Sequence, residues 1–167
     1  MAGADDRFRD WMGAHLAVLH RIARAFAESA DQHDLLQELM IAVWKAAPSF
    51  RGDSRPVTFI WRVAHNRALT WRRRESGRRA RAGEVQAEWL RLQPVGDADE
   101  AELLERLYGA IRRLAPVDRS IVLLSLEGAA YRDIAALHGL SETAVGARLT
   151  RARQQITRLV EGDDDGL

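Results

Sequence analysis

Apolar side chains recur every three to four residues along most of this chain, and no segment shows the two-residue alternation of a half-buried strand. In the first half the stripes are Leu16, Leu19, Ile22, Ala23 and Phe26; Leu35, Leu36, Leu39, Met40, Val43 and Trp44; and Phe59, Ile60, Val63 and Ala64. In the second half they are Leu103, Leu104, Leu107, Tyr108, Ile111 and Leu114; Ile121, Val122, Leu124 and Leu126; and Val145, Leu149, Ile156 and Leu159. The pattern predicts an all-α fold, in which Ile121, Val122, Leu124 and Leu126 are expected to be buried.

Loop-forming and capping residues divide the stripes into separate helices. The segment from Pro48 to Pro56 is rich in Gly, Asp, Ser and Pro, and it predicts a loop. Pro56 suits the first position of the helix that follows, because its backbone angle is already helical. Near the other end of the chain, Gly139 predicts a left-handed turn, and Ser141 predicts the cap of the last helix.

A stretch with little apolar pattern separates the two groups of stripes. Residues 76–100 are rich in Gly, Ala and charged residues, which predicts a flexible linker. Within it, Trp89, Leu90 and Leu92 have the spacing of a short helix that docks elsewhere. At 167 residues the chain is long enough for two small domains with modest cores. We therefore predict two small helical domains, residues 8–75 and 101–161.

The net charge of +1 hides a strong segregation of charge along the chain. Residues 55–81 hold nine Arg and one acid, residues 84–105 hold seven acids and one Arg, and residues 142–158 hold four Arg and one Glu. Two basic segments separated by an acidic spacer indicate two surfaces that face a polyanion. Ordinary solvated helix faces are the alternative interpretation of such Arg-rich runs.

Several classes of protein are disfavoured by what the sequence does not contain. With no Cys, the chain has no disulfide framework, no thiol nucleophile and no thiolate metal site. No apolar run approaches the roughly 18–20 residues of a membrane span, and the first residues lack the apolar core of a signal peptide. The five His are scattered, and the sequence shows neither a Gly-rich phosphate loop nor a nucleophile elbow. We therefore expect a cytoplasmic protein without membrane insertion, cofactor, metal or catalytic residues, and not an enzyme.

The segment 131–153 fits a helix-turn-helix, in which a short helix and a tight turn precede a helix that presents polar side chains to DNA. The side chains spaced to lock the two helices together are Ile134, Ala135, Leu140, Val145 and Leu149. Arg148 and Arg151 lie three residues apart, so they share a helix face that can meet phosphates or guanine edges. An ordinary helical hairpin with exposed Arg is the alternative.

Both halves of the chain resemble the extracytoplasmic-function (ECF) group of bacterial RNA polymerase sigma factors. The N-terminal half carries HDLLQE at 33–38, Trp-Lys at 44–45 and Phe-Arg-Gly at 50–52, which resemble the group's region two. The C-terminal half carries LAPVDRSIVLLSLEGAAYRDIAALHGLSETAVGARLTRARQQ at 114–155, which resembles its region four. The resemblance covers residues 8–75 and 101–160, in the order of the family.

The resemblance implies that the second helix docks on core RNA polymerase. The residues implied are Asp34, Gln37, Glu38, Trp44 and Lys45. A helical projection places Asp34, Glu38, Ile41 and Lys45 on one flank, opposite the apolar stripe, and an Ile among polar side chains favours a partner surface. A core position and an interface position are equally compatible with Trp44.

The loop at 50–54 and the helix after it resemble the part of these factors that reads the −10 promoter element. The implied DNA contacts are Phe50, Arg51, Asp53, Ser54, Trp61, Arg62, His65, Asn66, Arg72 and Arg73. Capturing an unstacked base needs aromatic walls and polar edges beside a basic groove, and this segment supplies such residue types. Ordinary core packing is the alternative for Phe50 and Trp61. We expect His65 to lie on the helix surface.

The last helix resembles the one that reads the −35 element. The implied contacts are Ser141, Glu142, Thr143, Ala144, Ala147, Arg148 and Arg151. Gly146 and Ala147 stand where the group commonly carries a Lys and a Ser that face DNA. Gly inside a helix also costs on the order of 1 kcal/mol relative to Ala. We therefore expect a −35 element that is weakly or differently read.

The resemblance implies an alternative sigma factor that binds core RNA polymerase, recognises the −35 and −10 elements and promotes strand opening. The implied partners are promoter DNA, the clamp helices of the largest polymerase subunit together with the flap, and an anti-sigma factor. A helix-turn-helix regulator whose N-terminal half serves dimerisation or sensing is the competing hypothesis.

Overall fold

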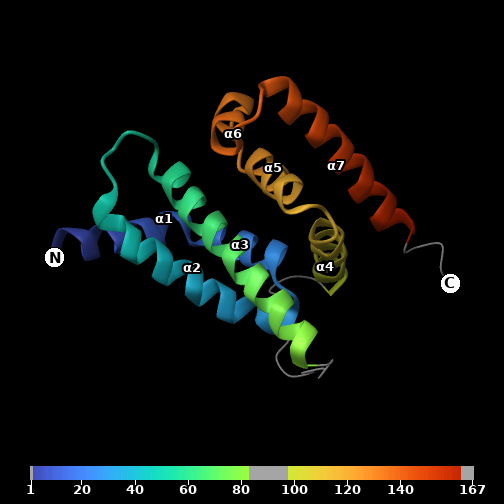
Figure 1. Ribbon diagram of the computed structural model, residues 1–167, viewed down its shortest axis with the longest axis horizontal. Helices are drawn as coiled ribbons and strands as arrows, with labels where there is room; N and C mark the ends of the chain where they lie inside the picture. Colours follow the sequence, from blue (N-terminus) through green and yellow to red (C-terminus); the bar gives the residue numbers. More distant parts are fainter. Residues whose placement is uncertain (1, 83–97, 163–167) are drawn as a thin grey trace. The chain divides into compact units, whose positions relative to one another are not determined.

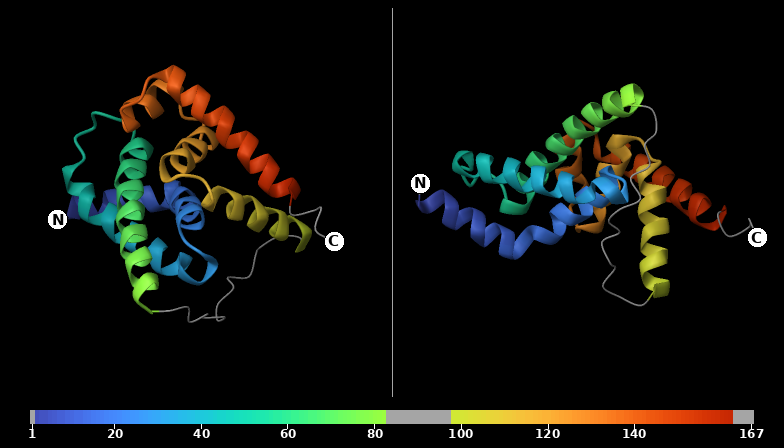
Figure 2. Two further views of the ribbon diagram at one scale, coloured as in Figure 1. Left: turned by 45° about the vertical axis from the view of Figure 1, so that its right-hand side comes forward. Right: turned by 90° about the horizontal axis from the view of Figure 1, so that it is seen from below.

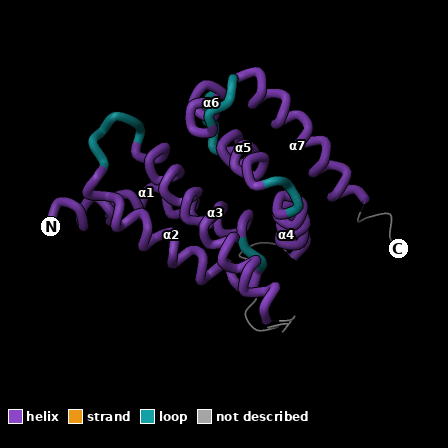
Figure 3. The backbone as a smooth tube through the Cα atoms, in the orientation of Figure 1, coloured by secondary structure: helices purple, strands orange, loops and turns teal. Residues whose placement is uncertain are grey.

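A computed structural model describes residues 2–82 and 98–162 of the chain, and these residues form helices joined by short loops. The α-helices are α1 (Ala2–Phe26), α2 (Gln32–Ala46), α3 (Pro56–Ala82), α4 (Ala98–Arg112), α5 (Pro116–Leu126), α6 (Tyr131–His138) and α7 (Glu142–Gly162). Two 3₁₀ turns, η1 (Ser29–Asp31) and η2 (Ala47–Ser49), flank α2. Figure 3 shows helices and loops and no strand over the described ranges, so the predicted all-α fold is confirmed.

The chain divides into two compact units, Met1–Leu92 (unit 1) and Gln93–Leu167 (unit 2). Helix α3 continues to Ala82, so residues 76–82 are helical although they belong to the predicted linker. Arg and Ala, which dominate this stretch, are among the strongest helix formers, and this explains the extension. The rest of the predicted linker up to residue 97, including the short helix expected around Trp89, lies outside the described residues.

Unit 1 is a bundle of α1, α2 and α3, each packed against the other two (Figure 1). Its long helices bury most of the predicted stripes, although Trp44 is exposed, and the fully covered side chains include Leu19, Ile22, Leu35, Leu39, Val43, Ile60 and Trp61. Helix α3 begins at Pro56, as predicted. The loop before it turns at Gly52, whose φ of 84° lies in the left-handed region that Gly adopts without strain.

Unit 2 consists of α4 to α7, and α7 packs against the other three helices, as Figures 1 and 2 show. Its core includes Tyr108, Ile111, Leu114, Ile121, Leu123, Ile134, Val145 and Leu149. Helix α5 is buried all round from Arg119 to Leu124. The prediction that Leu126 is buried was wrong, because this last residue of α5 lies beyond the covered stretch and is 65% exposed.

A buried Arg joins two helices of unit 2. The Arg119 side chain is 4% exposed, and its guanidinium donates hydrogen bonds to the carbonyl oxygens of Leu114, at 2.9 Å, and of Arg112. Arg112 is the last residue of α4, where a helix leaves its carbonyl groups without intrahelical partners, and Leu114 lies in the loop just after it. Arg119 therefore closes the end of α4 from inside α5.

Candidate functional site

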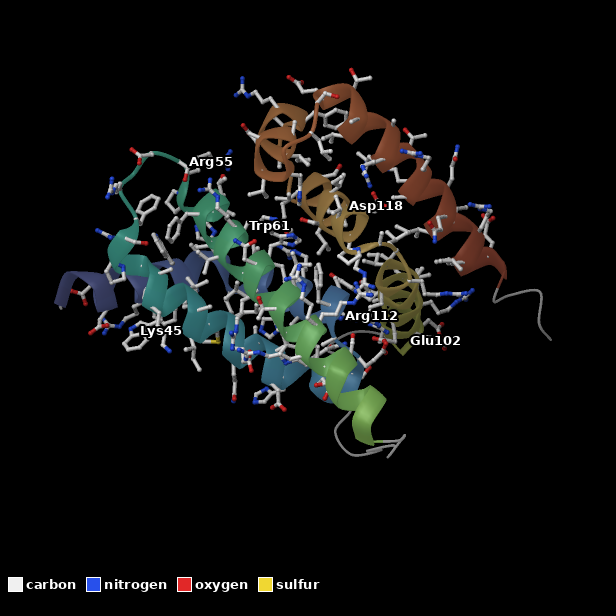
Figure 4. The ribbon with its side chains drawn as sticks, in the orientation of Figure 1. Lys45, Arg55, Trp61, Glu102, Arg112 and Asp118 are labelled. Carbon is white, nitrogen blue, oxygen red and sulfur yellow. The ribbon has the colours of Figure 1, made fainter. Side chains whose placement is uncertain are left out.

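The outer face of α2 carries the residues predicted to meet a protein partner. Asp34, Gln37 and Lys45 are exposed, and Figure 4 labels Lys45 on this helix. Gln37 bonds to the His33 ring at 3.0 Å. Glu38 is half-buried and forms a 2.6 Å ion pair with Arg67, which ties α2 to α3. The flank predicted from the sequence is therefore present on the surface, with Glu38 drawn towards α3.

Two large apolar side chains stand out on the same helix. Ile41 is 51% exposed and Trp44 is 48% exposed, so Trp44 is not a core residue. Both line an open groove of about 560 Å³ between α1 and α2, together with Asp5, Phe8, Arg9, Met12 and Met40. An exposed apolar patch of this kind is typical of a site of protein–protein interaction.

The residues predicted to meet −10 DNA fall into an exposed group and a buried group. Arg51 and Asp53 in the loop, and Arg62, Asn66 and Arg73 on α3, are exposed, whereas Ser54, Arg72 and Phe50 are half-buried. Phe50 packs edge-on against Trp11 and Phe59, with ring centroids 5.2 Å from each. The aromatic ring of the loop is therefore anchored on unit 1, beside an exposed basic flank of α3.

Trp61 and His65 lie inside the bundle. Trp61 is 1% exposed, as ordinary core packing requires, and its indole N–H finds no hydrogen-bond acceptor among the described residues. The prediction that His65 lies on the helix surface was wrong, because its ring is 6% exposed. Four residues along α3 from Trp61, it stacks with that indole at 6.5 Å and meets Phe26 edge-on at 5.7 Å.

The helix-turn-helix geometry is present in unit 2. Helix α6 ends at Gly139, whose φ is 64°, and the Ala144 N–H donates a 3.1 Å hydrogen bond to the Ser141 hydroxyl, so both predictions are confirmed. Ile134, Ala135, Val145 and Leu149 are buried between the helices, and Leu140 is half-buried. The predicted DNA contacts Ser141, Glu142, Thr143, Ala147 and Arg151 are exposed, and Ala144 is half-buried.

Arg148 is held by the rest of the unit. Its guanidinium donates to Asp118 of α5 at 2.9 Å, and Figure 4 shows Asp118 on the side of α5 that faces α7. The Arg148 side chain is still 37% exposed, so it is oriented without being removed from solvent. Beside it, burial and then the charge of Arg148 lower the pKa of His138, whose Nε2 lies 2.9 Å from the Ser120 hydroxyl.

Gly146 packs against the first residue of α6. A β-carbon at this position would stand 3.4 Å from Cε2 of Tyr131, which is ordinary contact distance. The Tyr131 ring is 41% exposed and lies against the place where a longer side chain at position 146 would leave the helix. The surface at position 146 is therefore bordered by an aromatic ring, at a position where the group commonly carries a Lys.

Two sigma-factor families match this chain, one in each half. Sigma-70 region 2 matches residues 11–78, and sigma-70 region 4 matches residues 104–156. The ECF RNA polymerase sigma factor SigM of Mycobacterium tuberculosis is 30% identical over 164 residues, which span 96% of this chain and 80% of the relative. The ECF sigma-E factor of Escherichia coli is 30% identical over 157 residues, which span 85% and 82%. The chain belongs to the ECF group of sigma factors.

This ECF sigma factor also shares its fold with two solved structures. The Bartonella quintana sigma factor RpoE, solved with the anti-sigma factor NepR, has a TM-score of 0.72 and 22% identity, covering 92% of this chain and 96% of that one. CnrH, solved with the cytosolic domain of CnrY, has a TM-score of 0.65 and 23% identity, covering 93% and 88%. The factor binds core RNA polymerase and recognises promoters at transcription initiation.

Sequence analysis of this sigma factor missed the first turns of α1. Asp5, Phe8 and Arg9 line the groove beside Trp44, yet they precede residue 11, where the match to region 2 begins. The spacing of Phe8, Trp11 and Met12 was a signal for an apolar face, and it is visible in the sequence.

Residues 2–82 and 98–162 contain no group of three or more His, Asp or Glu placed to hold a metal ion. Within the same ranges, no helix is long and apolar enough to cross a bilayer.

Proposed function

We propose that the two units divide promoter recognition between them. Residues 8–75 bind core RNA polymerase and read the −10 element, residues 101–161 read the −35 element, and residues 76–100 link them. The support for this division is that unit 1 exposes a groove with apolar walls and unit 2 exposes the polar start of a helix-turn-helix.

The observation that carries the proposal is the exposure of Trp44 and Ile41 on α2. Half of each side chain meets water, although burying an apolar side chain of this size is worth about 1.5–3 kcal/mol. A partner that covers the groove recovers this free energy. We assign that role to the clamp helices of the largest polymerase subunit, with Asp34, Gln37, Glu38 and Lys45 at the polar edge.

On the DNA-facing side of unit 1, the loop at 50–54 and the exposed flank of α3 contact the −10 element. Arg62, Arg72 and Arg73 hold phosphates, and Asn66 can bond to a base edge. Strand opening follows if an unstacked base is held near the ring of Phe50. Trp61 and His65 support this surface from within the core.

In unit 2, the start of α7 enters the DNA groove, as in other helix-turn-helix proteins. Ser141, Glu142, Thr143, Ala144 and Ala147 face the bases, and Arg151 meets phosphate. Arg148 does the same from the orientation that Asp118 imposes. Because phosphate contacts release counterions, affinity for the −35 element falls steeply with salt.

The remaining partners follow from the group. We propose that the factor acts in the cytoplasm, contacts the polymerase flap through unit 2, and is held in check by an anti-sigma factor. The two structural relatives were solved with NepR and with the cytosolic domain of CnrY, which supports that last point. No step assigned to the chain makes or breaks a covalent bond, so we assign it no catalytic residue.

Run-off transcription with core RNA polymerase and a genomic promoter library tests the proposal. Adding the factor should yield transcripts from a defined set of promoters, whereas core polymerase alone should yield none. Trp44→Ala should abolish or weaken these transcripts through loss of core binding, and His20→Ala, a substitution of an exposed residue on α1 outside the groove lining, is the control. Binding to duplex DNA as a dimer, with no affinity for core polymerase, would instead support the competing regulator hypothesis.

A further inference from the structure

A hydrogen bond beside the groove joins α1 and α2 through two residues that are distant in the sequence. The indole N–H of Trp44 donates a 3.0 Å hydrogen bond to the Asp5 carboxylate, 39 residues away. In the same stretch of α1, the guanidinium of Arg7 donates to the carbonyl of Ala47 at 2.9 Å and lies 5.9 Å from the centre of the Phe50 ring. Residues 5–9 are therefore attached to the C-terminal end of α2.

The hydrogen bond matters because about half of the Trp44 side chain is in contact with solvent. A side chain that is half exposed samples several rotamers, and a partner that needs one of them must meet the entropic cost of selecting it. An acceptor at the right place on α1 selects the rotamer before the partner arrives. The ring of Trp44 is then ordered in advance, and docking loses less conformational entropy.

The same segment supplies much of the groove. Asp5, Phe8 and Arg9 line it from α1, and an ion pair of 2.8 Å between Asp6 and Arg9 orders the Arg. All four residues precede the match to sigma-70 region 2, which begins at residue 11. This part of the surface is therefore specified by the chain's own N-terminal residues and not by the matched family region.

We propose that residues 5–9 complete the polymerase-docking face and that Asp5 is a positioning residue, which holds Trp44 in the orientation that core RNA polymerase meets. The inference rests on the proposed function, in which that polymerase occupies the groove. It adds a second helix to the face, and it assigns to Asp5 a role that depends on its acceptor oxygen and not on its charge.

Two substitutions at position 5 separate these roles. Asp5→Ala removes the acceptor and the charge, whereas Asp5→Asn removes the charge and keeps an acceptor oxygen. Binding of the full-length factor to immobilised core RNA polymerase should weaken about fivefold in Asp5→Ala, the net effect of losing one ordinary hydrogen bond, and stay near the original in Asp5→Asn. Asp10→Ala, an exposed acid on the same helix outside the groove lining, should leave binding unchanged.

A double-mutant cycle tests whether Asp5 acts through Trp44. Trp44→Phe keeps an aromatic ring but has no N–H to donate, so Asp5→Ala should cause no further loss of polymerase affinity in that background. NMR of the free factor supplies a readout independent of the polymerase. The Trp44 indole N–H signal, assigned by its disappearance in Trp44→Phe, should shift and exchange faster with water in Asp5→Ala and not in Asp5→Asn.

Each failure has a distinct signature. Equal losses of affinity in Asp5→Ala and Asp5→Asn, or the same loss in the Trp44→Phe background, would overturn the positioning role, because a charge or a direct contact would then account for it. Full affinity in Asp5→Ala alongside weak binding by Trp44→Ala would overturn this inference alone. Full affinity in Trp44→Ala would overturn the assignment of the docking face in the proposed function as well.

Discussion

Aromatic rings are concentrated in unit 1, whereas the core of unit 2 is mainly aliphatic and its helices are linked by polar side chains. All five Trp and all four Phe of the chain lie in unit 1, and unit 2 holds the two Tyr. In unit 1 the rings of Trp11, Phe50 and Phe59 meet one another at 5.2–5.7 Å. In unit 2 the links between helices include the guanidinium of Arg119 and the pair of Arg148 with Asp118.

The difference in core packing corresponds to a difference in the surface that each unit exposes to its proposed partner. Unit 1 spans its bundle with large rings and leaves one of them, Trp44, at the edge of an apolar groove. In unit 2, polar side chains link the helices, and one of these links also orients an Arg on the surface expected to meet DNA. The side chains that pack each unit therefore resemble those on the surface that meets its proposed partner. These side chains are apolar on the surface for polymerase and cationic on the surface for DNA.

The largest effect expected from this comparison is the loss of a ring from unit 1. Trp61→Ala should lower the free energy of unfolding of unit 1 by about 3–5 kcal/mol, because the indole is 1% exposed and nothing can refill its space fully. Denaturant unfolding followed by Trp fluorescence does not report on unit 2, since residues 93–167 contain no Trp.

Two measurements make the Trp61 result decisive. Hydrogen exchange of α5 and α7 should stay unchanged, and Arg62→Ala, an exposed neighbour on α3, should leave the fluorescence transition in place. A loss below about 1 kcal/mol, or an equal loss in both units, would show that the aromatic core does not dominate unit 1.

The counterpart in unit 2 is removal of the buried guanidinium. Arg119→Met keeps most of the side-chain volume but leaves the carbonyls of Leu114 and Arg112 without their donor, which should cost unit 2 about 3 kcal/mol. Faster hydrogen exchange in α4 and α5, with an unchanged Trp fluorescence transition, is the expected pattern. Arg113→Ala is the exposed control, and stability equal to the original protein would show that the apolar packing of unit 2 suffices.

A smaller effect is expected on the affinity of unit 2 for DNA, from a substitution on its surface that leaves its core unchanged. Gly146→Lys should strengthen binding to duplex −35 DNA by roughly fivefold and steepen its salt dependence by about one counterion, because the new ammonium can reach phosphate. The Tyr131 ring, 3.4 Å from the point where the new β-carbon would stand, needs to move little. Gly146→Ala is the matched control, since it gains the same helix propensity without the charge. Equal affinity in the two variants would mean that position 146 does not face DNA.

The smallest expected effect is a dependence of stability on pH, and it is confined to unit 2. Because burial and Arg148 lower the pKa of His138, the unfolded chain binds the proton more readily than the folded unit just below the ordinary value of 6.5. The stability that neutral His138 contributes is therefore present above pH 6.5 and is lost as the pH falls through the lowered pKa. Hydrogen exchange of α5 to α7 at about pH 7.5 and about pH 5.5 measures it, and His138→Gln should flatten the difference. An undiminished pH dependence in that variant would exclude His138 as its cause.

Much of the fold was predictable because its signals are local. Pro56 at the start of α3, Gly139 at the end of α6 and the Ser141 cap each depend on backbone geometry within a few residues. Helical periodicity placed most core stripes correctly for the same reason. The prediction for Leu126 was wrong because the burial of a residue at the end of α5 depends on which neighbouring helices extend that far.

The candidate site was predicted less completely, because exposure is decided between helices. The sequence left Trp44 open between core and interface, and placed His65 on the surface, whereas the bundle exposes Trp44 and buries His65. Both side chains are aromatic and carry a polar group, so periodicity alone does not show whether they are buried or exposed. Asp5 could not be linked to Trp44 at all from a pattern that repeats over four residues.

The sequence by itself determined the helices, their caps, the segregation of Arg and acid, and the membership of the chain in the ECF group. Each of these depends on residue types at short spacing, which a linear pattern records. The tertiary structure decided which side chains remain available: the groove at Trp44, the Asp5 hydrogen bond across 39 residues, and the orientation of Arg148 by Asp118. Those features require helices to meet at particular distances, and only packing sets such distances.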